Sequence, residues 1–303
     1  MSQINLQEYD VIYISYDEPN AEENWVDLLT KIPYAQRVHG IKGSDAAHKA
    51  AANLSTTDRF ITIDGDNIID ATFVNQLVDL DDSVDICRSV FSWPSLNPIN
   101  GLLYGNGGIK CWPKELVLNM RTHEHAEPGN IRAQIDFCWD IHYVALDTSY
   151  STTNNNVTPY QAWRAGFREG VKMCLDQGLK TPDLNTLYKG NLNRLLTWMM
   201  VGADVENGLW AILGARQGCY LTQFTDWDYI NVRDFDYLTD YWNNNVIHLS
   251  SSDLKYHIDR LGAILGKYIP VENVLTPDQS RFVKQLNINP IRQLDTVKLT
   301  RVE

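Results

Sequence analysis

Cysteine is scarce in this 303-residue chain, and its five cysteines are widely spaced with no Cys-x-x-Cys pair. Neither a disulfide framework nor a zinc knuckle is indicated, and a reducing cytoplasm fits this cysteine usage best. No window approaches 18 apolar residues, so we expect no membrane-spanning helix and no membrane partner. The first twenty residues carry acids where a signal peptide needs a basic start and an apolar run.

Positive charge is also in short supply. Lys and Arg number 26 against 38 Asp and Glu, which gives a formal net charge of −12. This balance excludes a surface coated in positive charge but is compatible with a local basic groove. A phosphate-rich partner must therefore meet a bound cation or clustered Lys and Arg. The remaining composition, 44% hydrophobic and 21% charged, is that of an ordinary globular protein.

Short apolar runs alternate with helical patterns through the first 90 residues. Strands are predicted at residues 11–14, from Val38, at 60–63 and at 84–87, and helices at 22–30, 46–54 and 70–80. This order predicts an α/β fold with a doubly wound, mostly parallel sheet flanked by helices. Ligands of such a sheet bind beyond the carboxyl ends of its strands. The continuous apolar runs suit strands that are covered on both faces.

The pattern changes beyond residue 100. Glycines surround Tyr104 and Asn106 and predict a flexible loop, and the polar stretch 151–158 predicts a mobile one. Helices are predicted at 114–120, 160–178, 192–200, 209–215 and from Thr276 to about 286. The C-terminal part is therefore expected to be helical.

Two carboxylates, Asp64 and Asp66, directly follow the apolar strand at 60–63 and are separated by Gly65. Two hard oxygen ligands in this arrangement suit Mg²⁺ or Mn²⁺, with diphosphate oxygens completing an octahedron. Such a metal would neutralise charge developing on a departing nucleotide diphosphate. The alternative is an Asp-Gly turn with solvated acids. The similar triplet at 234–236 follows no comparable strand and is not expected to be a site.

Three segments occur in order along the chain: the run YDVIYISYDEPN, the Gly- and Ala-rich helix start at 43–53 and the run FITIDGDN. Together they resemble the nucleotide-sugar half of GT-A-fold glycosyltransferases. The resemblance covers about the first 110 residues. It implies a GT-A-like fold, Asp64 and Asp66 as metal ligands and a UDP-sugar donor. The residues that it places around the donor are Ser15, Tyr16, Asp17, Glu18, Asp64 and Lys49, the last standing where the family has Arg.

The segment Tyr104-Gly105-Asn106-Gly107-Gly108 resembles the glycine-bearing loop that lies over sugar and acceptor in this family. The resemblance implies donor contacts at Gly107 and Gly108, where backbone amides could approach sugar hydroxyls, and an acceptor contact at Asn106. The alternative is an ordinary hairpin turn.

An inverting transferase needs a carboxylate base within hydrogen-bond reach of the acceptor hydroxyl. Asp136 and Asp140 are the candidate catalytic residues, because they follow the glycine-rich segment and would share one face of a helix. Alternatively these acids cap a helix or pair with Arg132, and a retaining enzyme would need no such base. Either His248 or His257 could supply a third metal ligand.

Arg164 and Arg168 share a face of the predicted helix at 160–178, a spacing that could bind phosphates of the donor or of nucleic acid. A solvated Arg-Glu pair is the alternative.

A narrower resemblance concerns glycosyltransferase-like proteins of tailed phages with modified DNA bases. The chain resembles these proteins in the runs ISYDEPNAEENW, IDGDN, GNGGIKCWP and AWRAGFREG. This resemblance implies transfer of arabinose or glucose to 5-hydroxymethylcytosine in phage DNA within the host cytoplasm.

These expectations divide the chain into a donor-binding half at 1–113, an acceptor-binding half of the same domain at 114–250, and a C-terminal helical extension at 251–303. Three alternatives stay open: a glycan or small-molecule acceptor, a nucleotidyltransferase, and a non-catalytic protein that binds nucleotide sugars. A nucleotidyltransferase would normally carry a Gly-rich, basic loop after the first strand, where this chain has the acidic Tyr-Asp-Glu-Pro-Asn.

Overall fold

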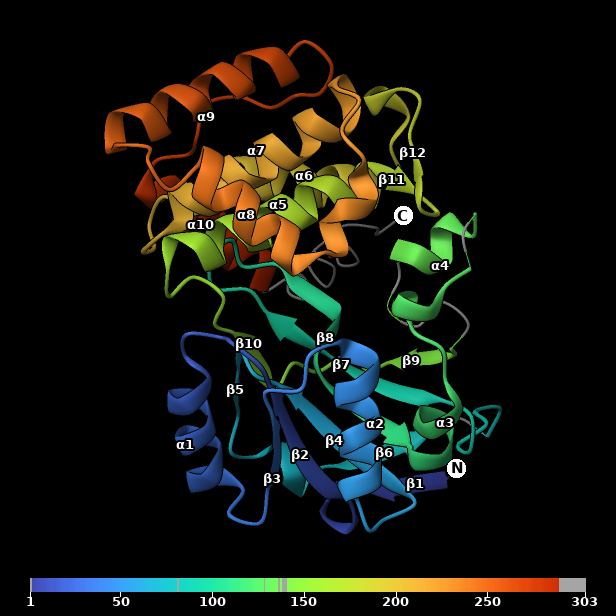
Figure 1. Cartoon of the computed structure of the whole chain (residues 1–303). Helices are drawn as coiled ribbons and strands as arrows, with labels where there is room; N and C mark the ends of the chain where they lie inside the picture. The colour runs from blue at the N-terminus through green and yellow to red at the C-terminus, as the bar shows by residue number, and fades with distance from the viewer. Residues whose placement is uncertain (1, 81, 128, 136, 138–140, 289–303) are drawn as a thin grey trace, which may run out of the picture. The chain divides into compact units, whose positions relative to one another are not determined.

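The computed structural model describes residues 2–80, 82–127, 129–135, 137 and 141–288, and the chain divides into two compact units (Figure 1). The first unit comprises residues 1–97 and 103–154, and the second comprises 98–102 and 155–303. The predicted boundaries do not coincide with this division. Residue 113 ends a strand inside the first unit, and residue 250 precedes a helix inside the second. The functional halves assigned to those ranges stay a prediction.

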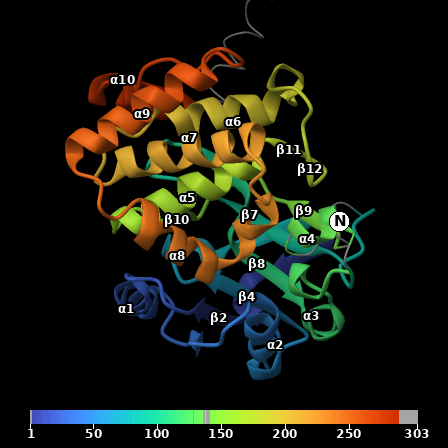
Figure 2. The ribbon, with the colours of Figure 1, turned by 45° about the horizontal axis from the view of Figure 1, so that its top comes forward.

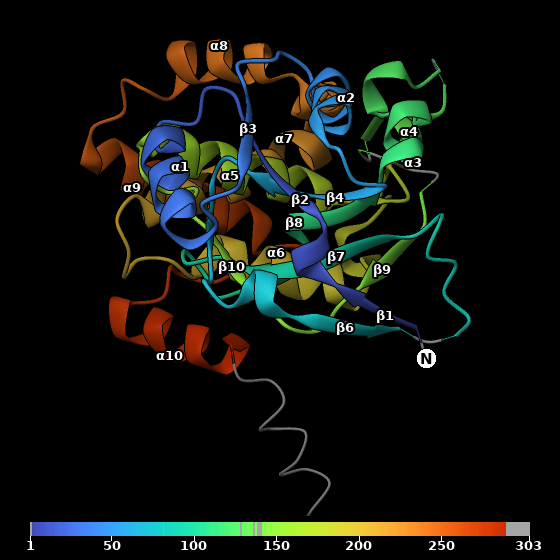
Figure 3. The same ribbon diagram turned by 90° about the horizontal axis from the view of Figure 1, so that it is seen from below.

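A mixed sheet of eight strands forms the centre of the first unit (Figure 3). Its strands are β2 (Asp10–Ser15), β3 (Gln36–His39), β4 (Arg59–Asp64), β5 (Asn67–Ile69), β7 (Val90–Leu96), β8 (Leu103–Pro113), β9 (Tyr143–Ala145) and β10 (Ser151–Thr153). They are ordered β3-β2-β4-β8-β7-β10-β5, and β9 pairs with β7 beside this path. A separate two-stranded sheet joins β1 (Ser2–Asn5) to β6 (Leu77–Leu80).

The α/β class is as predicted, and the sheet is mixed: four of its seven strand pairings are parallel and three are antiparallel. β2 pairs in parallel with β3 and β4, whereas β8 runs antiparallel to both β4 and β7. The physical reason is the short connection between β7 and β8, residues 97–102. Parallel neighbours need a long crossover, and so short a connection reverses the chain into an antiparallel pair.

Apolar residues of β2 point alternately to two buried clusters, one on each face of the sheet. Val11 and Tyr13 pack with Leu28 of α1 (Ala21–Lys31). Ile12 packs with Ala51 of α2 (Ser44–Leu54). The two helices therefore cover opposite faces, which explains the continuous apolar run of this strand. The first unit also contains α3 (Lys114–Asn119), α4 (Ile131–Ile135), η1 (Leu6–Glu8), η2 (Phe73–Asn75) and η3 (His123–His125).

Two elements predicted in the first unit are wrong. The helix predicted at 70–80 is instead the 3-10 turn η2 followed by β6, and the strand predicted at 84–87 is turn and loop. The reason lies outside the local sequence: β6 pairs antiparallel with β1 near the start of the chain. A long-range strand partner therefore overrides the helical pattern of this segment.

Two predicted loops are also strands in part. Most of the glycine-rich segment belongs to β8, and residues 151–153 form β10 between β7 and β5. Gly107 and Gly108 allow close packing inside the sheet, since a Cβ on Gly107 would lie 2.5 Å from the backbone nitrogen of Ser95. A Cβ on Gly108 would overlap the side-chain amide of Asn67. Glycine here serves a close approach of chains rather than loop flexibility.

The second unit is helical, as expected for the C-terminal part (Figure 2). Its helices are α5 (Pro159–Lys172), α6 (Lys189–Met200), α7 (Gly208–Phe224), α8 (Phe235–Asn245), α9 (Ser251–Leu265) and α10 (Pro277–Ile288), with the short η4 (Leu184–Thr186) and η5 (Tyr229–Arg233). A small hairpin joins β11 (Leu175–Asp176) to β12 (Leu179–Lys180). α5 starts as predicted: the Thr158 side chain accepts a hydrogen bond from the Gln161 backbone N–H, and Pro159 is the first helical residue.

The helices α5 and α7 pack backbone against backbone. Two glycines four residues apart face the partner helix on each of them: Gly166 and Gly170 on α5, Gly214 and Gly218 on α7. A Cβ at any of the four would lie closer than 3.0 Å to a carbonyl oxygen of the partner helix. Both helices therefore depend on glycine for this approach. None of the described helices has the length and apolar content needed to cross a membrane.

A buried cation ties the helices of the second unit together. The Arg216 guanidinium of α7 donates hydrogen bonds to the carbonyl oxygens of Met199, Ile258 and Glu272, at 3.0, 2.8 and 2.9 Å. Burial lowers the pKa of Arg216 to about 10. The guanidinium thus joins α7 to α6, to α9 and to the segment that follows α9.

Helix α10 fastens the short segment 98–102 into the second unit. Lys284 forms an ion pair of 2.7 Å with Asp204, with both side chains largely buried, and donates to the Pro98 carbonyl at 3.0 Å. Asn287 donates to the Asn100 carbonyl at 3.2 Å. The segment 98–102, where this unit begins in the sequence, is therefore held by α10.

Candidate functional site

The carboxyl ends of β2, β3 and β4 meet at one edge of the sheet in the first unit. Their last residues are Ser15, His39 and Asp64; Ser15 lies opposite His39, and Asp64 opposite Ile14. The end of β4 at Asp64 agrees with the sequence prediction. This edge is where open α/β sheets bind ligands.

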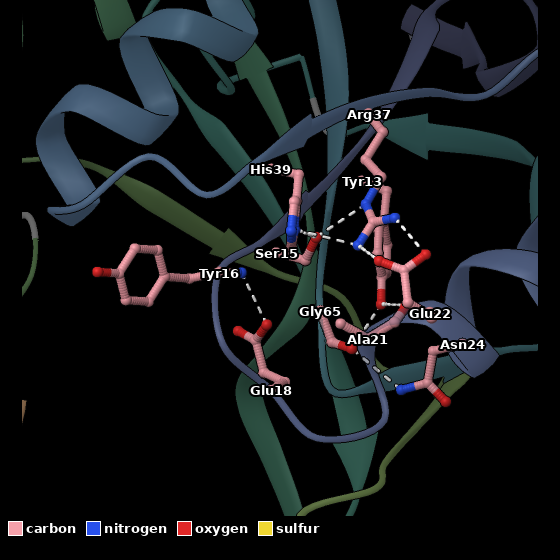
Figure 4. Close-up of polar contacts among 10 residues, drawn as sticks. All are labelled: Tyr13, Ser15, Tyr16, Glu18, Ala21, Glu22, Asn24, Arg37, His39 and Gly65. Atoms are coloured by element: carbon pink, nitrogen blue, oxygen red, sulfur yellow. Dashed lines mark hydrogen bonds and ion pairs between the residues drawn. The ribbon is translucent and has the colours of Figure 1, made fainter. Parts of the chain in front are cut away.

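The turn that carries the two aspartates is held by buried side chains (Figure 4). The Tyr13 hydroxyl lies 2.6 Å from the Gly65 carbonyl and 3.0 Å from the Ala21 carbonyl, and the Asn24 amide donates to Gly65 at 3.0 Å. Burial raises the pKa of Tyr13, so its hydroxyl remains a donor. The backbone between Asp64 and Asp66 is therefore fixed from within the fold.

We expect Tyr13→Phe to lower the free energy of unfolding by about 1 kcal/mol, because two buried carbonyls would share fewer donors. Urea denaturation followed by circular dichroism measures this change. Tyr34→Phe is the matched control, since the Tyr34 side chain is 50% exposed. Equal midpoints for Tyr13→Phe and the wild type would show that the hydroxyl does not hold the turn.

The Glu18 side chain covers this turn. Its Oε2 accepts a hydrogen bond of 2.8 Å from the Tyr16 backbone N–H. A Cβ on Gly65 would lie 2.7 Å from the same oxygen, so glycine is needed for the carboxylate to pack there. The ring of Tyr16 points away from this cluster and is exposed (Figure 4). The fold thus brings the predicted nucleotide-contacting loop and the predicted metal-binding turn to one place.

The Asp66 carboxylate is oriented by the residue that follows it. Asn67 donates to Asp66 Oδ1 at 2.8 Å, and its own Oδ1 accepts from the Ser95 hydroxyl at 3.1 Å. Asn67 is buried, and Gly108 leaves the space for its amide. An amide held in this way fixes the direction of the neighbouring carboxylate, as outer ligands do in metal sites.

Lys110 of β8 faces the other aspartate. Its Nζ lies 4.0 Å from Asp64 Oδ2 and donates to the Gly107 carbonyl at 2.7 Å. The Lys110 side chain is 13% exposed and that of Asp64 is 44% exposed. The site therefore combines an accessible carboxylate with a fixed positive charge, an arrangement that suits an anionic ligand bridged by a metal.

A polar network beside Ser15 was not anticipated from the sequence (Figure 4). Arg37 Nε donates to Ser15 Oγ at 3.0 Å, and the same oxygen lies 2.9 Å from His39 Nδ1. Arg37 also lies 3.1 Å from Nδ1 and can only donate, so Nδ1 is the acceptor and the ring proton is on Nε2. An ion pair of 2.7 Å with Glu22 completes the network, and the Arg37 guanidinium holds the pKa of Glu22 below its usual range.

The missed residues differ in the signal that the sequence offers. Arg37 and His39 are two apart in a strand and therefore point to the same face. Lys110 is the second residue after the glycine-rich segment, but its approach to Asp64 depends on the pairing of β4 with β8. Strand alternation could have found the first pair, whereas nothing local marks Lys110.

His48 of α2 lies near the Asp64 end of the site. Its Nδ1 is 2.8 Å from the Ser44 carbonyl, and its ring packs against Phe137 and Trp112. Burial lowers the pKa of His48, although the charge of Asp64 opposes this. The ring is therefore neutral with a proton on Nδ1.

We expect the neutral, half-buried His48 ring to make the protein less stable in acid. Because the folded-state pKa lies below the ordinary 6.5, the unfolded chain binds the extra proton first, and stability falls as the pH drops below 6.5. His48→Gln should flatten the decline in melting temperature between pH 7 and pH 5, measured in EDTA. The exposed His248 provides the control variant His248→Gln, which should keep the wild-type decline.

The other predicted donor and acceptor residues of the first unit lie on α2 and β8. Lys49 forms an ion pair of 2.8 Å with Asp45 on α2. Gly107 and Gly108 are within β8, as is the backbone of Asn106. Asp136 and Asp140 lie outside the described residues.

In the second unit, His248 is exposed in the turn after α8, and His257 lies on α9. The guanidinium carbons of Arg164 and Arg168 lie 4.8 and 4.9 Å from the centre of the Phe235 ring, so the two arginines share a face of α5 as predicted. Asp234 caps α8 by accepting from the Tyr237 N–H, which agrees with a structural role for the triplet at 234–236.

The acid pair fits a divalent cation of the Mg²⁺ type. In the part of the chain that the structure describes, no three His, Cys, Asp or Glu side chains are close enough together to hold a metal. Mg²⁺, however, is usually bound by one or two carboxylates together with water and substrate phosphates. Asp64 and Asp66 offer that donor set.

Comparison of the chain with protein-family models, with curated proteins and with solved structures gives no match.

Proposed function

We propose that this protein is a metal-dependent glycosyltransferase that moves a sugar from a UDP-sugar to a hydroxyl acceptor. The observation that carries the proposal is the shared edge of β2 and β4, where the Glu18 carboxylate covers the turn between Asp64 and Asp66. A nucleotide held by the loop that follows β2 would present its diphosphate to Asp64 and Asp66 at this edge. The resemblance to GT-A enzymes is the second support.

Each side chain has a distinct role in this proposal. Asp64 and Asp66 would hold Mg²⁺ or Mn²⁺, which when bound neutralises charge on the leaving diphosphate. Asn67 keeps the Asp66 carboxylate in place, and Lys110 adds a positive charge beside Asp64. Tyr16 offers an exposed ring for the uracil.

The remaining donor contacts in the proposal come from the same loop and the neighbouring elements. Ser15, Asp17 and Glu18 would contact the ribose or the base, while Lys49, Gly107 and Gly108 would contact the diphosphate-sugar. Calorimetry with a panel of nucleotides tests this assignment, and preferential binding of a purine nucleotide would contradict it.

The proposed acceptor is 5-hydroxymethylcytosine in DNA. Its hydroxymethyl group supplies an alcohol outside the sugar-phosphate chain, and reaching it in a duplex requires the base to leave the stack. Arg164 and Arg168 would contact DNA phosphates, Asn106 the acceptor, and Asp136 or Asp140 would serve as the base. The net charge of −12 favours a second candidate, a neutral glycan or small-molecule acceptor.

A mass-spectrometric screen tests both candidates. Nucleotide sugars are incubated with Mn²⁺ and with hydroxymethylated DNA, unmodified DNA or oligosaccharides. We expect a sugar-sized mass increase on hydroxymethylated DNA alone. Transfer to an oligosaccharide but not to this DNA would leave the transferase and remove the DNA acceptor. The absence of both transfer and donor hydrolysis would contradict the transferase itself.

We expect the double variant Arg164→Ala/Arg168→Ala to bind DNA more weakly while still hydrolysing the donor. Each lost phosphate contact should flatten the dependence of log K on log salt by about one unit. Fluorescence anisotropy at several salt concentrations measures the slope. Arg260→Ala/Arg281→Ala removes two exposed arginines from the same unit and is the control. Equal slopes for both double variants would assign DNA binding elsewhere.

A further inference from the structure

A histidine faces a buried carboxylate at the start of α2. His125 Nδ1 lies 3.6 Å from Asp45 Oδ1, and Lys49 Nζ lies 2.8 Å from the other carboxylate oxygen, Oδ2. Asp45 is 6% exposed, and among the described residues no hydrogen bond reaches its Oδ1. A buried carboxylate oxygen is costly without a donor. The imidazole is the group that stands opposite this oxygen and can supply the proton.

The contact sets the orientation of the His125 ring. With the ring proton on Nδ1, facing the carboxylate, the opposite nitrogen Nε2 is a hydrogen-bond acceptor. The His125 side chain is 56% exposed, whereas that of Asp45 is 8% exposed. A carboxylate that holds one nitrogen of an imidazole while the other nitrogen is accessible is the arrangement of an oriented general base. Contacts of this kind are often long in a free enzyme and shorten when substrate binds.

The segment that carries His125 is anchored to the same helix. The neighbouring Glu124 accepts a hydrogen bond of 2.5 Å from the Ser44 backbone N–H, at the first residue of α2. Gly43 has a φ of +96°, and a Cβ there would lie 2.9 Å from Glu124 Oε2. The glycine therefore makes room for this carboxylate. Two adjacent residues of η3 thus contact the first turn of α2.

The pair lies on the side of the sheet that Asp64 faces. Phe60 of β4 packs in the cluster beneath α2, and Asp64, four residues further along the same strand, points to the same side. Because α2 follows β3, its first turn is at the carboxyl edge of the sheet. Burial lowers the pKa of His48, and the charges of both Asp64 and Asp45 oppose this shift, so the two carboxylates flank one ring. His125 and the proposed metal ligands therefore share one side of one edge.

We propose that His125 is the general base of sugar transfer and that Asp45 positions it. His125 Nε2 takes the proton of the acceptor hydroxyl, whose oxygen forms the new bond to the anomeric carbon of the sugar. The bond from that carbon to the diphosphate breaks, and its electron pair leaves with UDP. This inference rests on the proposed glycosyltransferase function. In it His125 takes the role that the sequence assigned to Asp136 or Asp140.

Chemical rescue tests the base. The full chain carrying His125→Ala is assayed in Mn²⁺ with UDP-glucose and hydroxymethylated DNA, with and without imidazole. We expect kcat to fall by about 10²- to 10⁴-fold, the usual contribution of a general base, while the Kd for UDP stays that of the wild type. Added imidazole should restore part of the rate, because it can take the place of the missing ring.

The control for rescue is His142→Ala, at an exposed histidine of the same unit. Its transfer rate should equal that of the wild type and should not respond to imidazole. Equal rates for His125→Ala and the wild type would overturn the proposal. A lower rate that comes with weaker UDP binding and no recovery in imidazole would also overturn it, because such a loss is structural.

A double-mutant cycle tests the positioning role of Asp45. Asp45→Asn keeps the shape of the side chain but removes the charge that stabilises the imidazolium, and we expect kcat to fall by up to about 10⁴-fold. In the double variant His125→Ala/Asp45→Asn the rate should equal that of His125→Ala alone, because Asp45 acts through the ring. Losses that multiply would show that Asp45 acts independently and would overturn its role.

The stereochemistry of the product separates this inference from the proposed function. Direct attack by a deprotonated hydroxyl inverts the α-linked glucose of the donor, so NMR should show a β-linkage. Retention would overturn the base and leave a glycosyltransferase. Loss of transfer in Asp136→Asn or Asp140→Asn, with full transfer in His125→Ala, would return the role to that aspartate. Absence of both transfer and donor hydrolysis in the wild type would contradict the proposed function, and the base with it.

Discussion

Asp64→Asn and Asp66→Asn are each expected to lower the rate of sugar transfer by about 10²- to 10³-fold, with the fold intact. A bound metal contributes several kcal/mol by stabilising charge on the leaving group, and each 1.36 kcal/mol is a factor of ten in rate. Asparagine keeps the size of the side chain but removes the negative charge that attracts the cation. The rate is measured as UDP release in saturating Mn²⁺.

The control for this pair is Asp79→Asn, an exposed aspartate of β6 whose hydrogen bond from Gln3 an asparagine oxygen can keep. Its transfer rate should equal that of the wild type, and circular dichroism should be unchanged in all three variants. Full activity of the wild type in EDTA would contradict the metal assignment. Wild-type activity of Asp66→Asn would contradict it equally.

Gly214→Val should destabilise the second unit by about 3 kcal/mol, because overpacking at this position cannot be relieved by a side-chain movement. The Cβ would meet the backbone of Trp163 and Phe167, so α5 and α7 would have to separate. For a unit of this size such a loss corresponds to a melting temperature lower by roughly 6–12 °C. Differential scanning calorimetry measures it.

Gly190→Val is the matched control, because the three atoms nearest to its Cβ all belong to the exposed ring of Tyr188, which can rotate away. Its melting temperature should stay close to that of the wild type. If Gly214→Val melted at the wild-type temperature, the close approach of α5 and α7 would not be a source of stability.

The parallel centre of the sheet could be predicted because its signals are local. The apolar run at 60–63 and the acids that follow it are consecutive, so both the strand and the metal-binding candidates emerge from one short segment. The rest of the sheet depends on partners far apart in sequence. β6 pairs with the N-terminal β1, and β10 lies between β5 and β7.

Some residues of the candidate site also have a local signal in the sequence, whereas others depend on partners far apart in sequence. Gly107 and Gly108 indicate a loop when taken alone, because their close contacts come from Ser95 and Asn67 on other strands. Arg37 becomes part of the site only through the pairing of β3 with β2. The sequence therefore indicated the two acids, which lie in one short segment, but not the basic residues that strand pairing adds to the site.

The contacts of α10 impose an order on synthesis. Lys284 and Asn287, which bond the carbonyls of Pro98 and Asn100, leave the ribosome 186 and 187 residues after them. At roughly 5–20 residues per second, the segment 98–102 waits for roughly 9 to 37 seconds before α10 is synthesised. Ile99, fully buried in the finished protein, is exposed during that time. The nascent chain is therefore open to aggregation and to chaperone binding until α10 has been synthesised.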